Sequence, residues 1–250
     1  MSSVFITGGT TGIGMEMAKY YLAHGWKVGV CGRDRLKFQA NFQGLEDRVS
    51  FYEVDVTERE KLKAAMAEFS RPTGLDLVIA NAGIGFKQKT KIPDWNYSYR
   101  MIDINLVGVM HTFEAATEIM IPQGRGHLAA ISSLAAFNGL PGVAAYSATK
   151  AAVIKFCESL SLDLKKFNIQ VTTICPGFIA TPLTAHHTHP MPFLMSAPKA
   201  AEKIAYAIER KKLLYAFPFF FATIVRLMGM LPRRLYRSLM TFKKFNYSKE

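Results

Sequence analysis

Short apolar runs alternate along most of the chain with longer stretches whose apolar positions recur at helical spacing. Apolar runs of about four to eight residues, bounded by glycine, proline or polar residues, are typical of buried strands. Such runs lie at residues 3–6, 27–31, 49–54, 76–80, 126–132, 169–175 and 213–217. Strands that alternate with helices form parallel sheets covered on both faces. The pattern therefore predicts an α/β fold, a doubly wound parallel sheet of about seven strands.

The stretches with helical periodicity lie between these strands, at residues 15–23, 58–69, 99–119, 146–166 and 198–211. Asn105 falls inside one of them, although an asparagine within a helix competes for backbone hydrogen bonds. It could face solvent, but its apolar neighbours favour a specific role. Residues 178–197 read as an irregular segment, and loops of this length are usually functional.

Length and composition are compatible with one large domain. The chain has 250 residues, half of them apolar, and three cysteines that are far apart and have no metal-binding spacing. Such thiols are typical of a reducing compartment, and the N-terminal apolar run is too short for a signal peptide. We therefore expect a cytoplasmic protein, with one domain over residues 1–217 and an extension over residues 218–250.

The extension carries most of the net charge of +12, because residues 210–250 hold ten Lys or Arg and one Glu. Residues 219–231 are apolar but too short to span a bilayer, and Arg226 interrupts them. Residues 232–245 alternate basic and apolar side chains at roughly helical spacing. This pattern predicts a helix lying in a membrane interface, as peripheral membrane contact. The alternative is a helix packed on a partner subunit, while nucleic acid fits poorly because polar base-reading residues are lacking.

A glycine-rich loop follows the first strand and precedes the first helix. It consists of Thr7, Gly8, Gly9, Thr10, Thr11, Gly12, Ile13 and Gly14. Strand, glycine loop and helix place a phosphate at a helix N-terminus. The second strand ends at Arg33 and not at an acid that could hold a ribose 2′-hydroxyl, so NADP is favoured over NAD. The alternative is a solvated Arg33 beside Asp34 acting as a helix N-cap.

Tyr146 and Lys150 are one helical turn apart on one face of the predicted helix. A free phenol has a pKa near ~10, and a neighbouring ammonium favours the phenolate and lowers that pKa. The pair could then give a proton to a carbonyl oxygen or take one from an alcohol. Taken alone, the spacing is also compatible with an ordinary helix.

Together with other motifs in a fixed order, these residues resemble the short-chain dehydrogenase/reductase family in its single-domain form. The resemblance covers residues 3–217 and implies a Rossmann-type fold. Positions that match the cofactor-binding motifs are the loop Thr7–Gly14, Asp55 and Val56, Asn81, Ala82 and Gly83, and Pro176, Gly177, Ile179 and Thr181. Positions that match the catalytic motif are Asn105, Ser133, Tyr146 and Lys150. The chain departs from the family pattern at Ala80, where asparagine is frequent, and at Thr11, which is basic in many NADP-preferring members.

The resemblance implies an NAD(P)-dependent oxidoreductase that interconverts a ketone or aldehyde and an alcohol. Ser133 would position the substrate oxygen, Tyr146 would act as general acid or base, and Lys150 would hold the nicotinamide ribose. Asn105 would hold a water molecule that links Lys150 to solvent. The family also suggests a homo-oligomer, either a dimer or a tetramer. An alternative is a scaffold protein in which catalysis is incidental.

The irregular segment offers two further hypotheses. Its apolar residues are Phe178, Met191, Phe193, Leu194 and Met195. They suggest a lid that covers an apolar, lipid-like substrate. Alternatively, these side chains simply pack the lid onto the body of the protein. His186, His187 and His189 lie close enough to bind a metal, but no acid or cysteine completes a ligand set nearby. We therefore expect no metal site.

Overall fold

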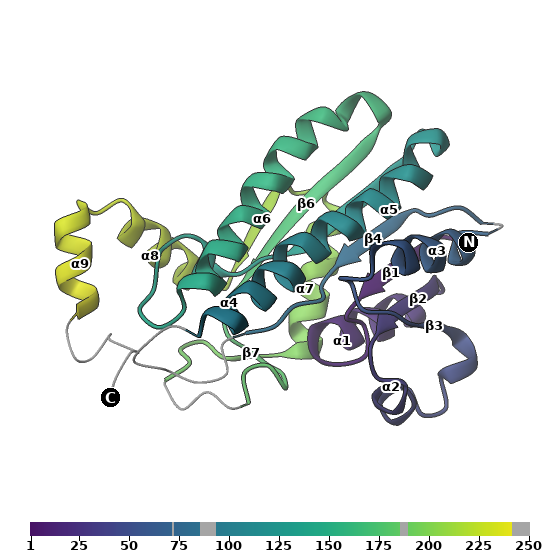
Figure 1. Cartoon of the computed structure of the whole chain (residues 1–250), viewed down its shortest axis with the longest axis horizontal. Coiled ribbons are helices and arrows are strands. Elements are labelled where there is room, and N and C mark those ends of the chain that lie inside the picture. The colour runs from purple at the N-terminus through teal and green to yellow at the C-terminus, as the bar shows by residue number, and fades with distance from the viewer. Residues whose placement is uncertain (72, 86–93, 186–189, 242–250) are drawn as a thin grey trace.

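Seven parallel strands form the central sheet (Figure 1), as the apolar pattern predicts. The structure, a computed structural model, describes residues 1–71, 73–85, 94–185 and 190–241. The strand order is β3-β2-β1-β4-β5-β6-β9, and every neighbouring pair runs parallel. The strands are β1 (Ser3–Thr7), β2 (Lys27–Gly32), β3 (Val49–Glu53), β4 (Leu77–Ala80), β5 (Gly126–Ile131), β6 (Ile169–Pro176) and β9 (Leu214–Phe217).

Helices cover both faces of this sheet (Figure 1). One face packs against α1 (Gly12–Ala23), α2 (Arg35–Asn41) and α7 (Ala197–Glu209), and the other against α3 (Arg59–Phe69), α5 (Gly108–Gln123) and α6 (Ala144–Asp163). Successive residues of β1 serve the two layers, since Val4 and Ile6 join one buried cluster and Phe5 joins the other. Both faces of the sheet are therefore dry, which explains why its strands read as continuous apolar runs.

The helix predicted for residues 99–119 is wrong as a single regular element. The structure has α4 (Trp95–Ile102), a π-helical turn at Asp103–Val107, and then α5. Asn105 lies in the π-helical turn and is fully buried. Such turns inside helices are frequent at functional sites, so the asparagine in mid-helix does mark a local departure from α-helical geometry.

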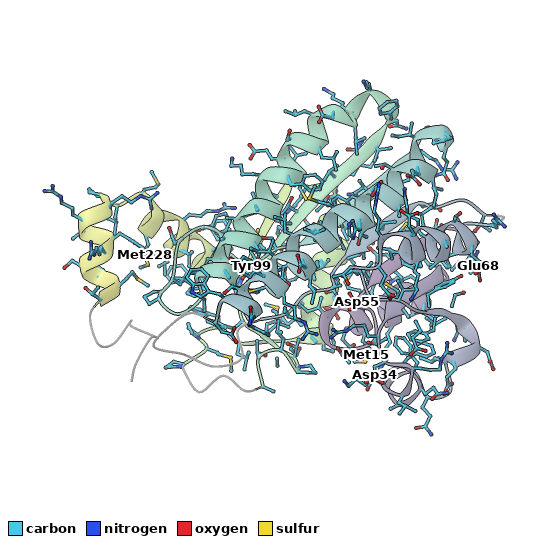
Figure 2. The ribbon with its side chains drawn as sticks, in the orientation of Figure 1. Met15, Asp34, Asp55, Glu68, Tyr99 and Met228 are labelled. Atoms are coloured by element: carbon cyan, nitrogen blue, oxygen red, sulfur yellow. The ribbon has the colours of Figure 1, made fainter. Side chains whose placement is uncertain are left out.

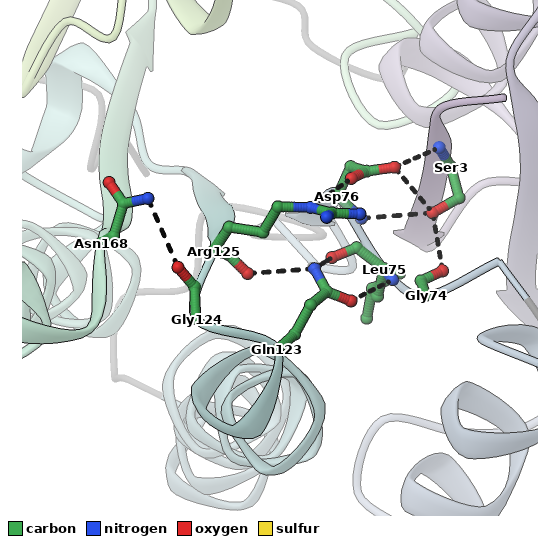
Figure 3. Close-up of polar contacts among 8 residues, drawn as sticks. All are labelled: Ser3, Gly74, Leu75, Asp76, Gln123, Gly124, Arg125 and Asn168. Carbon is green, nitrogen blue, oxygen red and sulfur yellow. Dashed lines mark hydrogen bonds and ion pairs between the residues drawn. The ribbon is translucent and has the colours of Figure 1, made fainter.

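Polar contacts join the amino ends of the sheet strands (Figure 3). The Asp76 carboxylate accepts a hydrogen bond from the Ser3 backbone N–H at 3.0 Å and pairs with Arg125 at 3.4 Å. The Gln123 side chain bonds both the N–H and the C=O of Leu75, at 3.0 and 2.9 Å. Side chains thus satisfy several backbone groups at this edge. Ligands of open parallel sheets bind at the opposite edge, where the strands have their carboxyl ends.

Beyond β9 the chain continues as α8 (Phe219–Gly229) and α9 (Arg233–Thr241), which extend from one end of the molecule (Figure 1). The segment expected to be irregular contains a short two-stranded ribbon, β7 (Ile179–Ala180) paired with β8 (Met195–Ser196). Within the described residues, no helix is both long enough and apolar enough to cross a membrane.

Candidate active site

A cavity of about 400 Å³ opens at the carboxyl edge of the sheet. Its walls include most of the residues expected to bind a cofactor or take part in catalysis: Gly8, Thr10, Thr11, Gly12, Ile13, Arg33, Asp55, Val56, Asn81, Ala82, Gly83, Ser133, Tyr146, Lys150, Pro176, Gly177, Ile179 and Thr181. These residues come from loops after β1, β2, β3, β4, β5 and β6 and from α6. The fold therefore assembles motifs that are spread over about 170 residues of sequence into one cleft.

The glycine loop has the close backbone approach that a phosphate requires. Gly8 and Gly12 have φ angles of +63° and +56°, a conformation that favours glycine. A Cβ atom at Gly8 would lie 2.7 Å from the Ala82 Cα, and one at Gly12 would lie 3.3 Å from Thr181. Because α1 begins at Gly12, its free backbone N–H groups face the cleft. These residues therefore fit the pyrophosphate of a dinucleotide.

Three residues of the predicted loop support it from behind and do not line the cavity. The Thr7 hydroxyl accepts hydrogen bonds from the backbone N–H groups of Asn81 and Ala82, at 3.1 and 3.3 Å. Gly9 and Gly14 have no room for a side chain, since a Cβ would lie 2.6 Å from Val30 and 2.4 Å from Gly8, respectively. Their contribution to binding is thus the shape of the loop.

Ser133, Tyr146 and Lys150 meet on one wall of this cavity. Lys150 is buried, and its Nζ donates a hydrogen bond to the Ile131 carbonyl at 2.8 Å and lies 5.9 Å from the centre of the Tyr146 ring. The Ser132 hydroxyl donates to the Lys150 carbonyl at 2.8 Å, which ties α6 to the end of β5. The Ser133 hydroxyl accepts a hydrogen bond from the Ala135 N–H at 3.1 Å.

Burial dominates the proton affinities of this wall. It lowers the pKa of Lys150 to about 8 and raises the pKa of Tyr146, while the Ser133 hydroxyl offsets part of that rise. The pKa of Tyr146 is thus raised in the protein alone, and desolvation of the phenolate is the largest cause. The lowering by a neighbouring ammonium stays a prediction, and a cation brought into the cavity would also favour the phenolate.

Asn105 does not line the cavity but lies directly behind it. Its side chain accepts a hydrogen bond from the Ile84 N–H at 2.8 Å and donates one to the Ile84 carbonyl at 2.9 Å. A Cβ atom at Gly83 would lie 3.2 Å from the Asn105 Oδ1 and 3.6 Å from the Lys150 Nζ. Asn105 and Lys150 thus border the same residue, and Asn105 uses one amide hydrogen and one lone pair of its Oδ1 on Ile84.

The end of the cavity at β2 and β3 is rich in charge, and Figure 2 labels its two acids, Asp34 and Asp55. Asp34 is the N-cap of α2, where its carboxylate accepts from the Lys37 N–H at 3.0 Å and pairs with the Lys37 ammonium at 3.0 Å. The backbone hydrogen bond lowers the pKa of Asp34. Arg33 lies 3.6 Å from Asp55, and its side chain remains 53% exposed. Two cations, Arg33 and Lys37, therefore face this end.

Sequence reasoning missed several residues that line the cavity: Cys31, Gly32, Asp34, Lys37, Val54, Ile84, Ile104, Ile131, Ser132, Pro182, Leu183 and Thr184. Most of them adjoin a motif residue and follow from its position. Lys37 does not, because it depends on α2, a short helix that the sequence offered only in the alternative with Asp34 as a helix N-cap. The structure confirms Asp34 as the N-cap of α2.

We call residues 178–185 and 190–197 the lid segment. The cavity wall at Gly177 connects the last strand, β9, to this segment. The Gly177 N–H donates to the Phe217 carbonyl at 2.7 Å, and the Met195 N–H donates to the Phe178 carbonyl at 3.0 Å. No group of metal-ligating side chains occurs among the described residues. The three histidines that were considered as metal ligands and rejected, His186, His187 and His189, lie outside the described residues.

A family model and several known proteins match this chain. The family model described as short chain dehydrogenase matches residues 2–191. An uncharacterized oxidoreductase of Myxococcus xanthus is 38% identical over 94% of each chain, and one of Mycobacterium tuberculosis is 35% identical over 94% of this chain and 95% of its own. Both matches cover so much of this chain that they must reach past Phe217 into the C-terminal helices.

Two solved structures share the fold. "ElxO with NADP Bound" has a TM-score of 0.77 at 24% identity and covers 86% of this chain and 96% of its own. "Crystal structure of gox2181" has a TM-score of 0.79 at 22% identity, with 88% and 96% covered.

Proposed function

The chain belongs to the short-chain dehydrogenase family, and we propose that it is an NADP-preferring oxidoreductase that interconverts a carbonyl compound and an alcohol. One observation carries the proposal: Ser133, Tyr146 and Lys150 line the same cavity as the glycine loop. A proton donor and a dinucleotide site that share one cleft can act on the same substrate.

The residues of this wall would handle the proton while a bound nicotinamide supplies or accepts the hydride at the substrate carbon. In reduction, the Tyr146 hydroxyl gives its proton to the carbonyl oxygen, and in oxidation the phenolate takes it from the alcohol. Ser133 hydrogen-bonds that same oxygen and orients it. Lys150 would hold the ribose hydroxyls. Asn105 would hold a water molecule behind Gly83 that replaces the proton, through the hydrogen-bonding capacity left over from its two bonds to Ile84.

The preference for NADP over NAD rests on the charges after β2. The acid at this position, Asp34, is committed to the N-terminus of α2 and to Lys37, so it is not free for a ribose 2′-hydroxyl. Arg33 and Lys37 both line the cavity and suit a 2′-phosphate. The structural neighbour ElxO, whose structure has NADP bound, supports the same choice.

For the substrate we propose an apolar, lipid-like carbonyl compound, because the lid segment, which contributes Ile179 and Thr181 to the cavity wall, also exposes Phe193 and Leu194. We also propose a cytoplasmic homo-oligomer, a dimer or tetramer, with peripheral membrane contact through residues 218–250. The second candidate, a scaffold in which catalysis is incidental, is favoured only by the exposed apolar side chains of α8.

Replacing Tyr146 by phenylalanine tests the enzyme proposal. Tyr146→Phe removes only the hydroxyl, so NADPH binding should persist while NADPH oxidation with a panel of aldehydes and ketones falls by about 10²–10⁴-fold. Tyr99→Phe is the matched control, because Tyr99 (labelled in Figure 2) is exposed and does not line the cavity. A Tyr146→Phe enzyme that kept wild-type turnover would contradict the assignment, and a wild type that binds NADPH without turnover would favour the scaffold.

A further inference from the structure

Helix α8 exposes an apolar stripe on the side that faces away from the body of the protein. Phe220, Ile224 and Leu227 follow each other at intervals of four and three residues, which places them on one face. Phe220 and Leu227 are 65% and 58% exposed. Ala222 on the opposite side is buried, so the helix is anchored to the body through its other face. An exposed apolar stripe of this kind marks a surface that is buried when another protein or a membrane binds to it.

The stripe continues onto the lid segment. The Phe193 ring lies 6.3 Å from the Phe220 ring and 5.7 Å from the Phe221 ring, centre to centre, and Phe178 lies 6.1 Å from Phe221. Phe193 is itself 53% exposed, and Leu194 beside it is also exposed. We call the exposed members of this surface the apolar patch: Phe193, Leu194, Phe219, Phe220, Ile224 and Leu227.

Positive charge surrounds the apolar patch. Arg226 on α8 and Arg233, Arg234 and Arg237 on α9 are all exposed, and Figure 2 shows nitrogen-bearing side chains extending from this end of the molecule. Residues 218–249 contain no Asp or Glu. The surface therefore combines exposed aromatic and aliphatic groups with uncompensated cations.

Polar contacts hold both helices to the loop that follows Ser133. The Asn138 Nδ2 donates to the Val225 carbonyl at 2.6 Å, and the Tyr236 hydroxyl donates to the Gly139 carbonyl at 2.7 Å. The Arg226 guanidinium lies 4.8 Å from the centre of the Phe137 ring. Helix α8 thus contacts the segment after Ser133 and the lid segment, and α9 contacts the former. Both segments adjoin residues of the cavity wall, Ser133 on one side and Gly177 and Ile179 on the other.

We propose that the apolar patch and the arginines of α8 and α9 dock the protein on an anionic lipid bilayer. Apolar side chains would enter the interface while the arginines meet the headgroups. A second copy of the chain fits less well, because a two-fold interface brings the same surface of each copy together. That pairing would set arginines against arginines with no acid in residues 218–249 to neutralise them.

Docking in this way would bring the segments that adjoin the cavity wall toward the bilayer surface. An apolar carbonyl compound dissolved in the lipid would then reach the cavity along the lid segment without crossing bulk water. This second step rests on the proposed oxidoreductase function, whereas the docking itself does not. The two can fail separately, because one is measured by binding and the other by turnover.

The docking test uses the full-length protein and vesicles of phosphatidylcholine, with or without phosphatidylglycerol. Wild type should co-sediment with the anionic vesicles, and high salt should release part of it by screening. Arg233→Glu with Arg234→Glu should weaken binding at least about 30-fold, the equivalent of about 1 kcal/mol for each arginine removed. Ile224→Glu with Leu227→Glu should also abolish co-sedimentation. Neither pair touches the cavity, so turnover of a small water-soluble aldehyde should stay at the wild-type level.

The matched controls are Leu162→Glu, which changes an exposed leucine on α6, and Lys165→Glu with Lys166→Glu, a charge reversal near its end. Both should bind vesicles like wild type. The proposal is overturned if wild type ignores anionic vesicles, if the α8 and α9 variants bind as well as the controls, or if those variants instead split an oligomer seen by light scattering. The delivery step would be overturned if the protein binds anionic vesicles but turns over a long-chain ketone held in them no faster than the same ketone held in vesicles of phosphatidylcholine alone.

Discussion

Arg33 offers a direct test of the cofactor preference. Its guanidinium lies at the cavity wall and pairs loosely with Asp55 at 3.6 Å. A charge-assisted hydrogen bond to a phosphate contributes roughly 1.5–3 kcal/mol. Since the side chain is 53% exposed, solvent screening favours the lower bound, which corresponds to about a tenfold change in affinity. Arg33→Ala should therefore raise the Kd for NADPH about tenfold and leave the Kd for NADH almost unchanged.

The assay is a fluorescence titration of each variant with NADPH and with NADH at low and high salt. Arg35→Ala is the matched control, because Arg35 is exposed and close in sequence but pairs with Glu53 at 3.2 Å and does not line the cavity. Lys37→Ala should weaken NADPH binding less than Arg33→Ala, since the Lys37 ammonium is already 3.0 Å from Asp34. High salt should weaken NADPH binding more than NADH binding in the wild type.

Two results would refute this reasoning. If Arg33→Ala weakened the binding of both cofactors equally, the residue would serve the shape of the loop and not the 2′-phosphate. If the wild type bound NADH as tightly as NADPH at low salt, the charges after β2 would not discriminate at all.

Two further predictions concern groups outside the cavity. Burial of His127 lowers its pKa to about 4, whereas a histidine in the unfolded state has a pKa near ~6.5. Between these pH values the unfolded state binds one more proton, so the free energy of unfolding should fall by up to about 3 kcal/mol as the pH drops from 6.5 to 4. In urea denaturation, the free energy of unfolding of His127→Gln should fall less over that range. Asn105→Ala leaves the Ile84 N–H and carbonyl without their side-chain partner and should lower the free energy of unfolding by about 1–3 kcal/mol; an unchanged denaturation midpoint would show that water replaces the amide.

The sequence by itself determined the central sheet and most of the cavity. Each strand is an apolar run that is dry on both faces, so its pattern does not depend on which neighbour it pairs with. The cavity residues lie where those strands end, and the carboxyl ends of parallel strands meet at one edge. The glycine loop and Ser133 follow from these strand ends, whereas the resemblance to a known family added Tyr146 and Lys150 to the same site before any coordinates were known.

Only the tertiary structure decided features that depend on contacts between distant segments. The π-helical turn at Asn105 is joined to Ile84, which lies 21 residues earlier in the chain. Burial, which no local pattern reports, raises the pKa of Tyr146. The contacts of Val225 with Asn138 and of Phe221 with Phe193 place α8 beside the segment after Ser133 and the lid segment. An apolar and basic tail can be read from the sequence, but packing alone determines which part of the protein it lies against.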